Sequence, residues 1–272
     1  MNRCDICLDE KCDGEKNCNC STCQNSNKCY KFLHATIRIT NKCTQECSHC
    51  CFSSSPKRTE MMSIEMSESI SKFLKSNNVM SINVMGGEFF CNPNWYEILK
   101  NFGRVVINMR LVTNADWGIN DEVKLKLLDL KKEFGDSLHI AVSNDRWHTN
   151  KYVSKVEEFL SDNNFKFNIG DETNDKEEVI VPIGRSSGDY NFYGLFGCYC
   201  HNPQKMYSFL IDEEGKIYKC PFGVFDYADV CQYTEGGFAK RFKEFNKKFY
   251  SIFIPSCASC IRCARQKDAI IK

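Results

Sequence analysis

Cysteine limits what this chain can fold into more than any other residue, because the chain holds 19 cysteines in 272 residues. A secreted disulfide scaffold this rich in cysteine is normally short and carries a signal peptide. This chain opens with polar and charged residues and contains no uninterrupted apolar stretch of about 20 residues that could span a bilayer. We therefore expect a cytoplasmic protein whose reduced thiols bind metal, either as iron–sulfur clusters or as zinc.

The cysteines divide the chain into three parts. Seven lie before residue 30, four lie between residues 43 and 51, and seven follow residue 197, with Cys91 alone between the last two groups. We expect a cysteine-rich, metal-binding N-terminal segment at 1–32, a packed domain at 33–190, and a small cysteine-rich C-terminal module at 191–272.

Short β-branched runs alternate with amphipathic helical patterns in the middle part. Strands that alternate with helices favour right-handed βαβ units and a parallel sheet. We predict an α/β fold, a partial (β/α)6 TIM-like barrel, with its chemistry at the carboxyl ends of the strands. The C-terminal module should contain a hairpin at 206–212 and 216–219 and a helix at about 237–249. The predicted barrel strands are 35–40, 79–85, 104–112, 138–142, 165–169 and 178–183, and helices should start near Ser63, Pro93, Asn120 and Thr149.

Three cysteines after the first predicted strand have the spacing Cys43-x3-Cys47-x2-Cys50. Three thiolates on one loop can hold three corners of a cubane [4Fe–4S] cluster, which leaves one iron open for chemistry. The alternative is a zinc site that takes Cys51 or an N-terminal cysteine as its fourth ligand, because short spacings also occur in zinc modules.

This cysteine motif, with His49 before its last cysteine, resembles the radical S-adenosylmethionine (radical SAM) superfamily. Three further motifs in 33–190 are similar to those of the family and follow the second, third and fourth predicted strands. They are Gly86-Gly87-Glu88, then Thr113-Asn114 with Ala115 where the family has Gly, and Ser143-Asn144-Asp145. Zinc binding would explain only the first of the four motifs.

The resemblance implies that S-adenosylmethionine (SAM) binds the open iron beside Gly86, Gly87 and Glu88, with His49 near its adenine. Ser143, with Thr113 or Asn114, would bind ribose or carboxylate oxygens. Reduction of the sulfonium would then give a 5′-deoxyadenosyl radical that abstracts hydrogen from a substrate. The sequence assigns no catalytic acid or base. Asp145 and His148 should lie near the barrel mouth, although a plain surface loop is an equal interpretation.

The C-terminal thiols resemble the auxiliary-cluster extension known as SPASM or, in its shorter form, twitch. The pattern Cys200-x14-Gly215-x4-Cys220 precedes Cys257-x2-Cys260-x2-Cys263. The resemblance implies at least one auxiliary [4Fe–4S] cluster held by Cys200, Cys220, Cys257 and Cys260, with Cys198 or Cys263 as substitutes. A zinc knuckle is the alternative.

The N-terminal thiols have cluster-like or zinc-like spacing in a stretch with few apolar residues. Such a segment cannot fold by burial, so metal binding is its expected source of order. A further cluster or a zinc ion would use Cys4, Cys7, Cys18, Cys20 and Cys23.

The resemblance implies a peptide- or protein-modifying oxidoreductase or maturase that receives electrons from a flavodoxin- or ferredoxin-type donor. A radical SAM enzyme acting on a small molecule is the first alternative. A non-catalytic iron–sulfur or zinc-binding electron-transfer protein is the second, and it would not cleave SAM. Because 36 basic residues balance 35 acidic ones, we expect neither nucleic acid nor a membrane as a partner.

Overall fold

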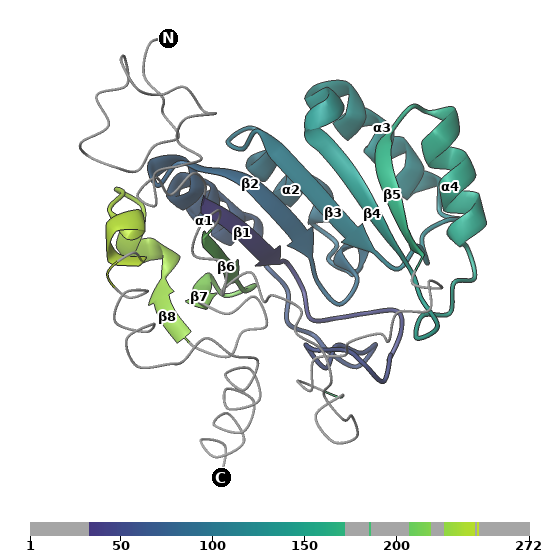
Figure 1. Cartoon of the computed structure of the whole chain (residues 1–272), viewed down its shortest axis with the longest axis horizontal. Coiled ribbons are helices and arrows are strands. Elements are labelled where there is room, and N and C mark those ends of the chain that lie inside the picture. The colour runs from purple at the N-terminus through teal and green to yellow at the C-terminus, as the bar shows by residue number, and fades with distance from the viewer. Residues whose placement is uncertain (1–32, 172–184, 186–206, 219–225, 243, 245–272) are drawn as a thin grey trace, which may run out of the picture.

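The protein, as a computed structural model, forms one mixed sheet with helices packed against it (Figure 1). The structure describes residues 33–171, 185, 207–218, 226–242 and 244. The helices are α1 (Ile64–Ser76), α2 (Trp95–Gly103), α3 (Asp121–Phe134) and α4 (Val153–Asp162). The strands are β1 (Leu33–Arg38), β2 (Val79–Met85), β3 (Asn108–Thr113), β4 (Leu138–Asn144), β5 (Lys166–Asp171), β6 (Tyr207–Ile211), β7 (Lys216–Tyr218) and β8 (Asp226–Asp229).

Helices α1 and α3 begin at polar caps, as the sequence pattern predicts, and each buries an apolar stripe. Ser63 accepts a hydrogen bond from the Met66 amide at 3.1 Å at the start of α1, and Asn120 caps α3 in the same way. On α1 the buried face includes Phe73 and Leu74, which pack on the sheet. Both predicted caps are therefore confirmed.

The sheet has the order β5-β4-β3-β2-β1-β6-β7-β8. Strands β1 to β5 pair in parallel, which agrees with the predicted βαβ units. Strand β6 also runs parallel to β1, with Leu33 opposite Tyr207 and Ile37 opposite Ile211. The predicted hairpin is confirmed as β6 and β7, which are antiparallel, and β8 continues it. The hairpin thus extends the parallel sheet of β1 to β5 on the other side of β1.

Several predicted boundaries differ from the structure. The first strand is Leu33–Arg38 instead of 35–40, and two further elements start later than predicted because their expected first residues make other contacts. The third strand begins at Asn108 instead of Arg104, since the Arg104 amide still donates to Lys100 at the end of α2. The fourth helix begins at Val153 instead of Thr149, whose amide donates to Gln45. The predicted strand at 178–183 lies outside the described residues.

The core lies between the sheet and the helices and is almost entirely apolar. Leu33, Ile37 and Val84 from the central strands are fully buried, as is Phe209 of β6. Phe73 contacts Phe209 edge to face, so the core continues beneath the β1–β6 pair. In the ranges that the structure describes, no helix is long and apolar enough to cross a membrane.

Candidate functional site

The three motif cysteines lie on one closed loop after β1, at residues 43–55, here called the cysteine loop. The Cys43 amide donates to the Ser55 carbonyl at 3.1 Å, which joins the two ends of the loop. The buried Ser54 hydroxyl donates to Asn41 at 2.7 Å just beneath it. Inside the loop, the Cys50 amide donates to the Cys47 carbonyl at 3.2 Å. The three cysteines therefore lie on a closed loop that follows the carboxyl end of β1.

The thiols of the cysteine loop are close enough to influence one another but do not meet at a point. Burial, reinforced by neighbouring thiols, raises the pKa of Cys43 to about 12 and that of Cys47 to about 11. Such thiols need a bound cation to ionise at neutral pH. Among the described residues, no three cysteine sulfurs gather within 4.8 Å of one another. A single tetrahedral zinc would draw its sulfurs to within about 4 Å. A cubane binds each thiolate at a different iron, so this donor set fits the cubane better.

Glu88 is the buried carboxylate at the end of β2. The Thr113 hydroxyl lies 3.1 and 3.0 Å from its two oxygens, and the Asn114 amide donates to it at 2.8 Å. Burial raises the pKa of Glu88 to about 7 in spite of these hydrogen bonds. Glu88 therefore joins the end of β2 to the end of β3.

Asn114 connects this carboxylate to the cysteine loop. Its side-chain nitrogen lies 3.7 Å from the Cys43 sulfur and 3.0 Å from the Thr44 hydroxyl. The structure thus brings together Cys43, Glu88, Thr113 and Asn114 at the carboxyl ends of three adjacent strands, where parallel α/β sheets carry their sites.

The glycine pair before Glu88 allows two backbone segments to pack tightly. A Cβ on Gly86 would lie 2.8 Å from the Thr40 carbonyl oxygen, and one on Gly87 would lie 2.3 Å from the Lys42 carbonyl oxygen. The amide of Gly87 donates to Thr40, and the amide of Glu88 donates to Lys42. In the structure, the chain that approaches these glycines is therefore the segment that leads from β1 into the cysteine loop.

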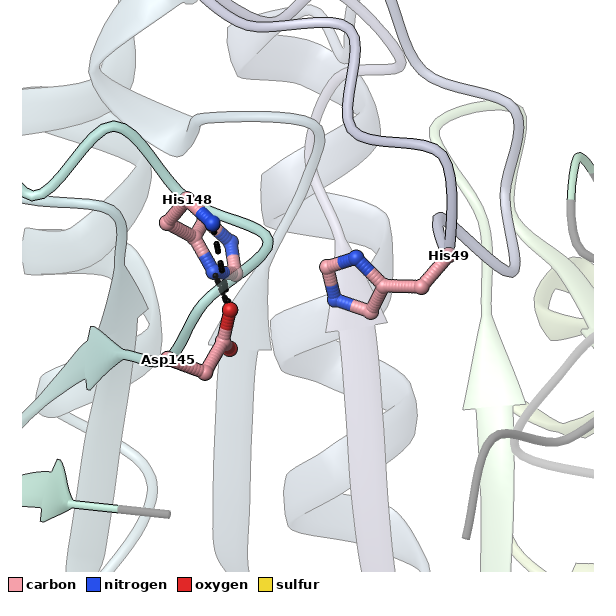
Figure 2. Close-up of side chains that lie close together, drawn as sticks. All are labelled: His49, Asp145 and His148. Carbon is pink, nitrogen blue, oxygen red and sulfur yellow. Dashed lines mark hydrogen bonds and ion pairs between the residues drawn. The ribbon is translucent and has the colours of Figure 1, made fainter. Parts of the chain in front are cut away.

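His49 faces the loop after β4 (Figure 2). Its ring centroid lies 5.2 Å from that of His148 and 5.7 Å from that of Trp147. Asp145 accepts from His148 Nδ1 at 2.8 Å, and both side chains are largely buried. Asp145 and His148 thus lie in a partly buried loop after β4 and contact each other, while Arg146 between them is exposed. Burial tends to raise the pKa of Asp145, but hydrogen bonds to His148 and Trp147 lower it overall.

The His49, Asp145 and His148 side chains each offer a ligand atom, and these atoms lie within 4.8 Å of one another. Such a nitrogen and oxygen set could hold a divalent metal ion, or its aromatic and polar groups could contact a nucleoside. Ser143 lies half-buried on the same edge of the sheet, at the end of β4.

Sequence reasoning did not predict that several polar side chains hold the cysteine loop in place. Gln45 is buried, and its amide nitrogen lies 3.1 Å from the Asp116 carboxylate and 3.0 Å from the Thr149 hydroxyl. Arg185 contacts the opposite part of the loop. Gln45 stands between motif cysteines, where residue type carries no signal, and the contacts of the others arise only from the fold.

The remaining predicted ligands lie outside the described residues. They are Cys4, Cys7, Cys18, Cys20, Cys23, Cys198, Cys200, Cys220, Cys257, Cys260 and Cys263.

Comparison with known proteins identifies relatives of this site. Residues 37–156 match the model of the radical SAM superfamily. The chain is 26% identical over 197 residues to AlbA, the antilisterial bacteriocin subtilosin biosynthesis protein of Bacillus subtilis (strain 168), with 65% of this chain and 43% of AlbA covered. It is 32% identical over 90 residues to YydG of the same organism, a protein provisionally named for peptide biosynthesis, with 31% and 27% covered. The chain thus spans less than half the length of either relative.

The structure resembles the crystal structure of BtrN in complex with AdoMet and 2-DOIA. The TM-score is 0.57 at 14% sequence identity, and the alignment covers 79% of this chain and 86% of BtrN. At that identity the likeness concerns the fold alone, an α/β fold with a parallel sheet.

Proposed function

We propose that this chain, which carries a radical SAM domain at residues 37–156, cleaves SAM reductively and abstracts hydrogen from a peptide or protein side chain. The observation that carries the proposal is the convergence of three motifs at one sheet edge. Asn114 reaches both Cys43 and Glu88: its side-chain nitrogen lies 3.7 Å from the Cys43 sulfur, and its backbone amide donates to the buried Glu88 carboxylate at 2.8 Å.

In this proposal Cys43, Cys47 and Cys50 hold a [4Fe–4S] cluster with one open corner. When bound, the cluster supplies the electron that splits SAM into methionine and a 5′-deoxyadenosyl radical. The thiolates fix the cluster beside the carboxyl ends of the strands, and their half-buried loop limits the access of water to it.

The protein side chains around the loop would orient SAM. Glu88 has a carboxylate positioned by Thr113 and Asn114 and can accept a hydrogen bond from the methionine amine. His49 would contact the adenine, with Ser143 bonding ribose or carboxylate oxygens. Because Thr113 and Asn114 already hydrogen-bond Glu88, we assign them to support Glu88.

The names of the relatives support a peptide as the substrate. AlbA is a bacteriocin biosynthesis protein and YydG is named for peptide biosynthesis, at low identity and over part of their lengths. By the same inference, an auxiliary cluster bound by Cys200, Cys220, Cys257 and Cys260 accepts an electron from the substrate, and a flavodoxin or ferredoxin reduces the first cluster.

Anaerobic reconstitution with iron and sulfide, followed by dithionite and SAM, tests the proposal. We expect 5′-deoxyadenosine from the wild type and none from the triple variant Cys43→Ala, Cys47→Ala, Cys50→Ala. The matched control is Cys231→Ser, because Cys231 is exposed on the short helix Val230–Tyr233, after β8. A wild type that binds iron without forming 5′-deoxyadenosine would favour an electron-transfer protein, and stoichiometric zinc in place of iron would contradict the cluster.

The peptide assignment has its own test. A precursor peptide encoded beside the gene should change mass when it is incubated with the reconstituted enzyme and SAM. Peptides that stay unmodified while a small molecule is consumed would contradict the peptide and favour the small-molecule alternative.

A further inference from the structure

We infer that Arg185 is a positioning residue that braces the cysteine loop and places a positive charge beside its cluster. Arg185 lies 138 positions after Cys47, yet its Nε donates to the Cys47 carbonyl at 2.8 Å. Its Nη2 donates to the Ser54 carbonyl, and its own amide donates to the Cys50 carbonyl at 3.1 Å. The inference rests on the proposed cluster at Cys43, Cys47 and Cys50.

The two side-chain contacts join separated points of the same loop. Cys47 lies near its middle and Ser54 near its end, so a planar guanidinium that bonds both carbonyls fixes their separation. A lysine ammonium can also donate, but it lacks the fork that holds two acceptors in one plane. Arg185 therefore constrains the loop backbone at the half that carries Cys47 and Cys50.

The opposite half of the loop is held by different residues. Gln45 bonds Asp116 and Thr149, and Asn114 bonds Thr44. Cys43 is thus positioned by the ends of β3 and β4. Among the described residues, Arg185 is the side chain from outside the loop that bonds the carbonyls at Cys47 and Ser54, so its loss leaves that half with less support.

The charge of Arg185 also acts on the thiols. The Arg185 Nε lies 2.8 Å from the Cys47 carbonyl oxygen and its Nη1 lies 3.9 Å from a carboxylate oxygen of Glu46, so the positive charge lies beside the part of the loop that carries Cys47. A nearby cation stabilises the more negative, reduced state of a cluster bound by thiolates. Removing this cation should therefore lower the reduction potential of the cluster.

Variants of the full chain can separate the fork from the charge. Arg185→Met removes both, and Arg185→Lys keeps the charge but loses the fork. The control is Arg58→Met, because Arg58 lies just beyond the loop and pairs with Glu60 on the exposed surface. After anaerobic reconstitution we would measure iron per chain, the rate of iron loss to bathophenanthroline, and the midpoint potential by electron paramagnetic resonance.

We expect Arg185→Met to lose iron about 10- to 100-fold faster than the wild type, the range typical for outer-sphere partners of metal ligands. Its potential should be lower. Arg185→Lys should lose iron faster than the wild type while keeping a potential near it, and Arg58→Met should match the wild type in both measurements.

Equal iron loss and equal potential in Arg185→Met and the wild type would overturn the inference and leave the proposed function intact. A wild type that binds no iron would instead overturn the proposed function. If circular dichroism shows that Arg185→Met does not fold, the iron-loss rate of Arg185→Lys becomes the deciding measurement. Iron loss from Arg185→Lys at the wild-type rate would exclude the bracing role.

Discussion

Gly87 is the residue at which one added methyl group should be most disruptive. Its missing Cβ leaves room for the Lys42 carbonyl oxygen, which would otherwise lie 2.3 Å away. We predict that Gly87→Ala destabilises the metal-free protein by about 1–3 kcal/mol, because backbone has to move on one side or the other. Urea unfolding measures this change, and iron content should fall with it. The control is Gly170→Ala on β5, where the nearest atom to the added Cβ lies at 3.6 Å. Equal effects in the two variants would contradict the steric explanation.

His34 on β1 should make stability depend on pH far from the candidate site. Burial and the nearby Arg110 charge lower the pKa of His34 to about 4, from 6.5. The folded state therefore favours the neutral ring. The stability that the neutral His34 ring contributes to the folded state is fully present above pH 6.5 and is lost as the pH falls from 6.5 to 4.

We predict that the stability difference between the wild type and His34→Gln changes by about 3 kcal/mol across that window, in the direction that favours the variant at low pH. Urea unfolding of both proteins at several pH values measures it. Two parallel stability curves would show that His34 does not carry this dependence.

Ala115 occupies a backbone conformation that normally favours glycine. Its φ is +67° and its side chain is fully buried after Thr113-Asn114. A left-handed backbone costs an L-residue about 1–2 kcal/mol, and glycine at this position would avoid that cost. Two effects oppose the gain: glycine lacks the buried methyl group, and it increases the conformational entropy of the unfolded chain. We predict that Ala115→Gly is neutral or stabilising by up to about 1 kcal/mol by urea unfolding. If Ala115→Gly lowered the free energy of unfolding by about 1 kcal/mol or more, as an alanine-to-glycine change does inside a helix, backbone strain at Ala115 would be contradicted.

At the residue scale, the sequence predicted the motif residues and missed their supports. Cys43, Glu88 and Asn114 were found because each follows a recognisable strand within a short, spaced motif. Arg185 and Thr149 reach the cysteine loop across more than a hundred residues of chain. No local pattern encodes such a contact, because it depends on how the strands and loops pack.

Among the elements, the hairpin of β6 and β7 is linked to the cysteine loop by a buried ion pair. Arg38 at the end of β1 donates to Glu213, between β6 and β7, at 2.7 and 3.2 Å. The Arg38 guanidinium also lies 5.1 Å from the centre of the Phe52 ring in the cysteine loop. The side chains of the pair are only 16% and 7% exposed, so water screens it weakly.

We predict that Glu213→Gln destabilises the protein by about 3 kcal/mol, because it leaves the Arg38 charge without its carboxylate. Thermal or urea unfolding measures the loss. The neighbouring Glu214→Gln provides the control, because Glu214 pairs with Lys216 on the exposed surface, where such pairs contribute about 0–1 kcal/mol. If both variants lose the same stability, the Arg38–Glu213 pair is no more important than a surface pair.

At the scale of elements, the sequence predicted where the strands lie along the chain better than it predicted which strands are neighbours in the sheet. The run 79–85 was predicted with its observed bounds because alternation and flanking glycines mark it locally. That β6 lies beside β1 was not predicted, since β-branched residues indicate a strand but not its neighbour. Pairing follows from the shared apolar core under β1 and β6.

For the whole molecule, the sheet should remain folded without metal while the cysteine loop does not. The core of the described ranges consists of apolar side chains such as Phe73, Phe102 and Phe209, all fully buried. The cysteine loop is held mainly by polar contacts and, in our proposal, by its cluster. These two parts therefore differ in what stabilises them.

We predict that chelation of iron speeds hydrogen exchange in the cysteine loop, at amides such as those of Cys50 and Ser53, and leaves the amides of β2 and β3 protected. Exchange measured by mass spectrometry on the reconstituted and the chelated protein checks this. Loss of protection across the whole sheet would mean that the cluster is required for the global fold.

The position of β6 next to β1 also has a consequence during synthesis. Among the described strands, β1 is translated first and can soon pair with β2, but β6, the described partner of its other hydrogen-bonding edge, is translated only at residues 207–211. At about 5–20 residues per second, that edge stays open for many seconds. Exposed edges template pairing between chains, so β1 is open to pairing with another chain during the interval before β6 is made.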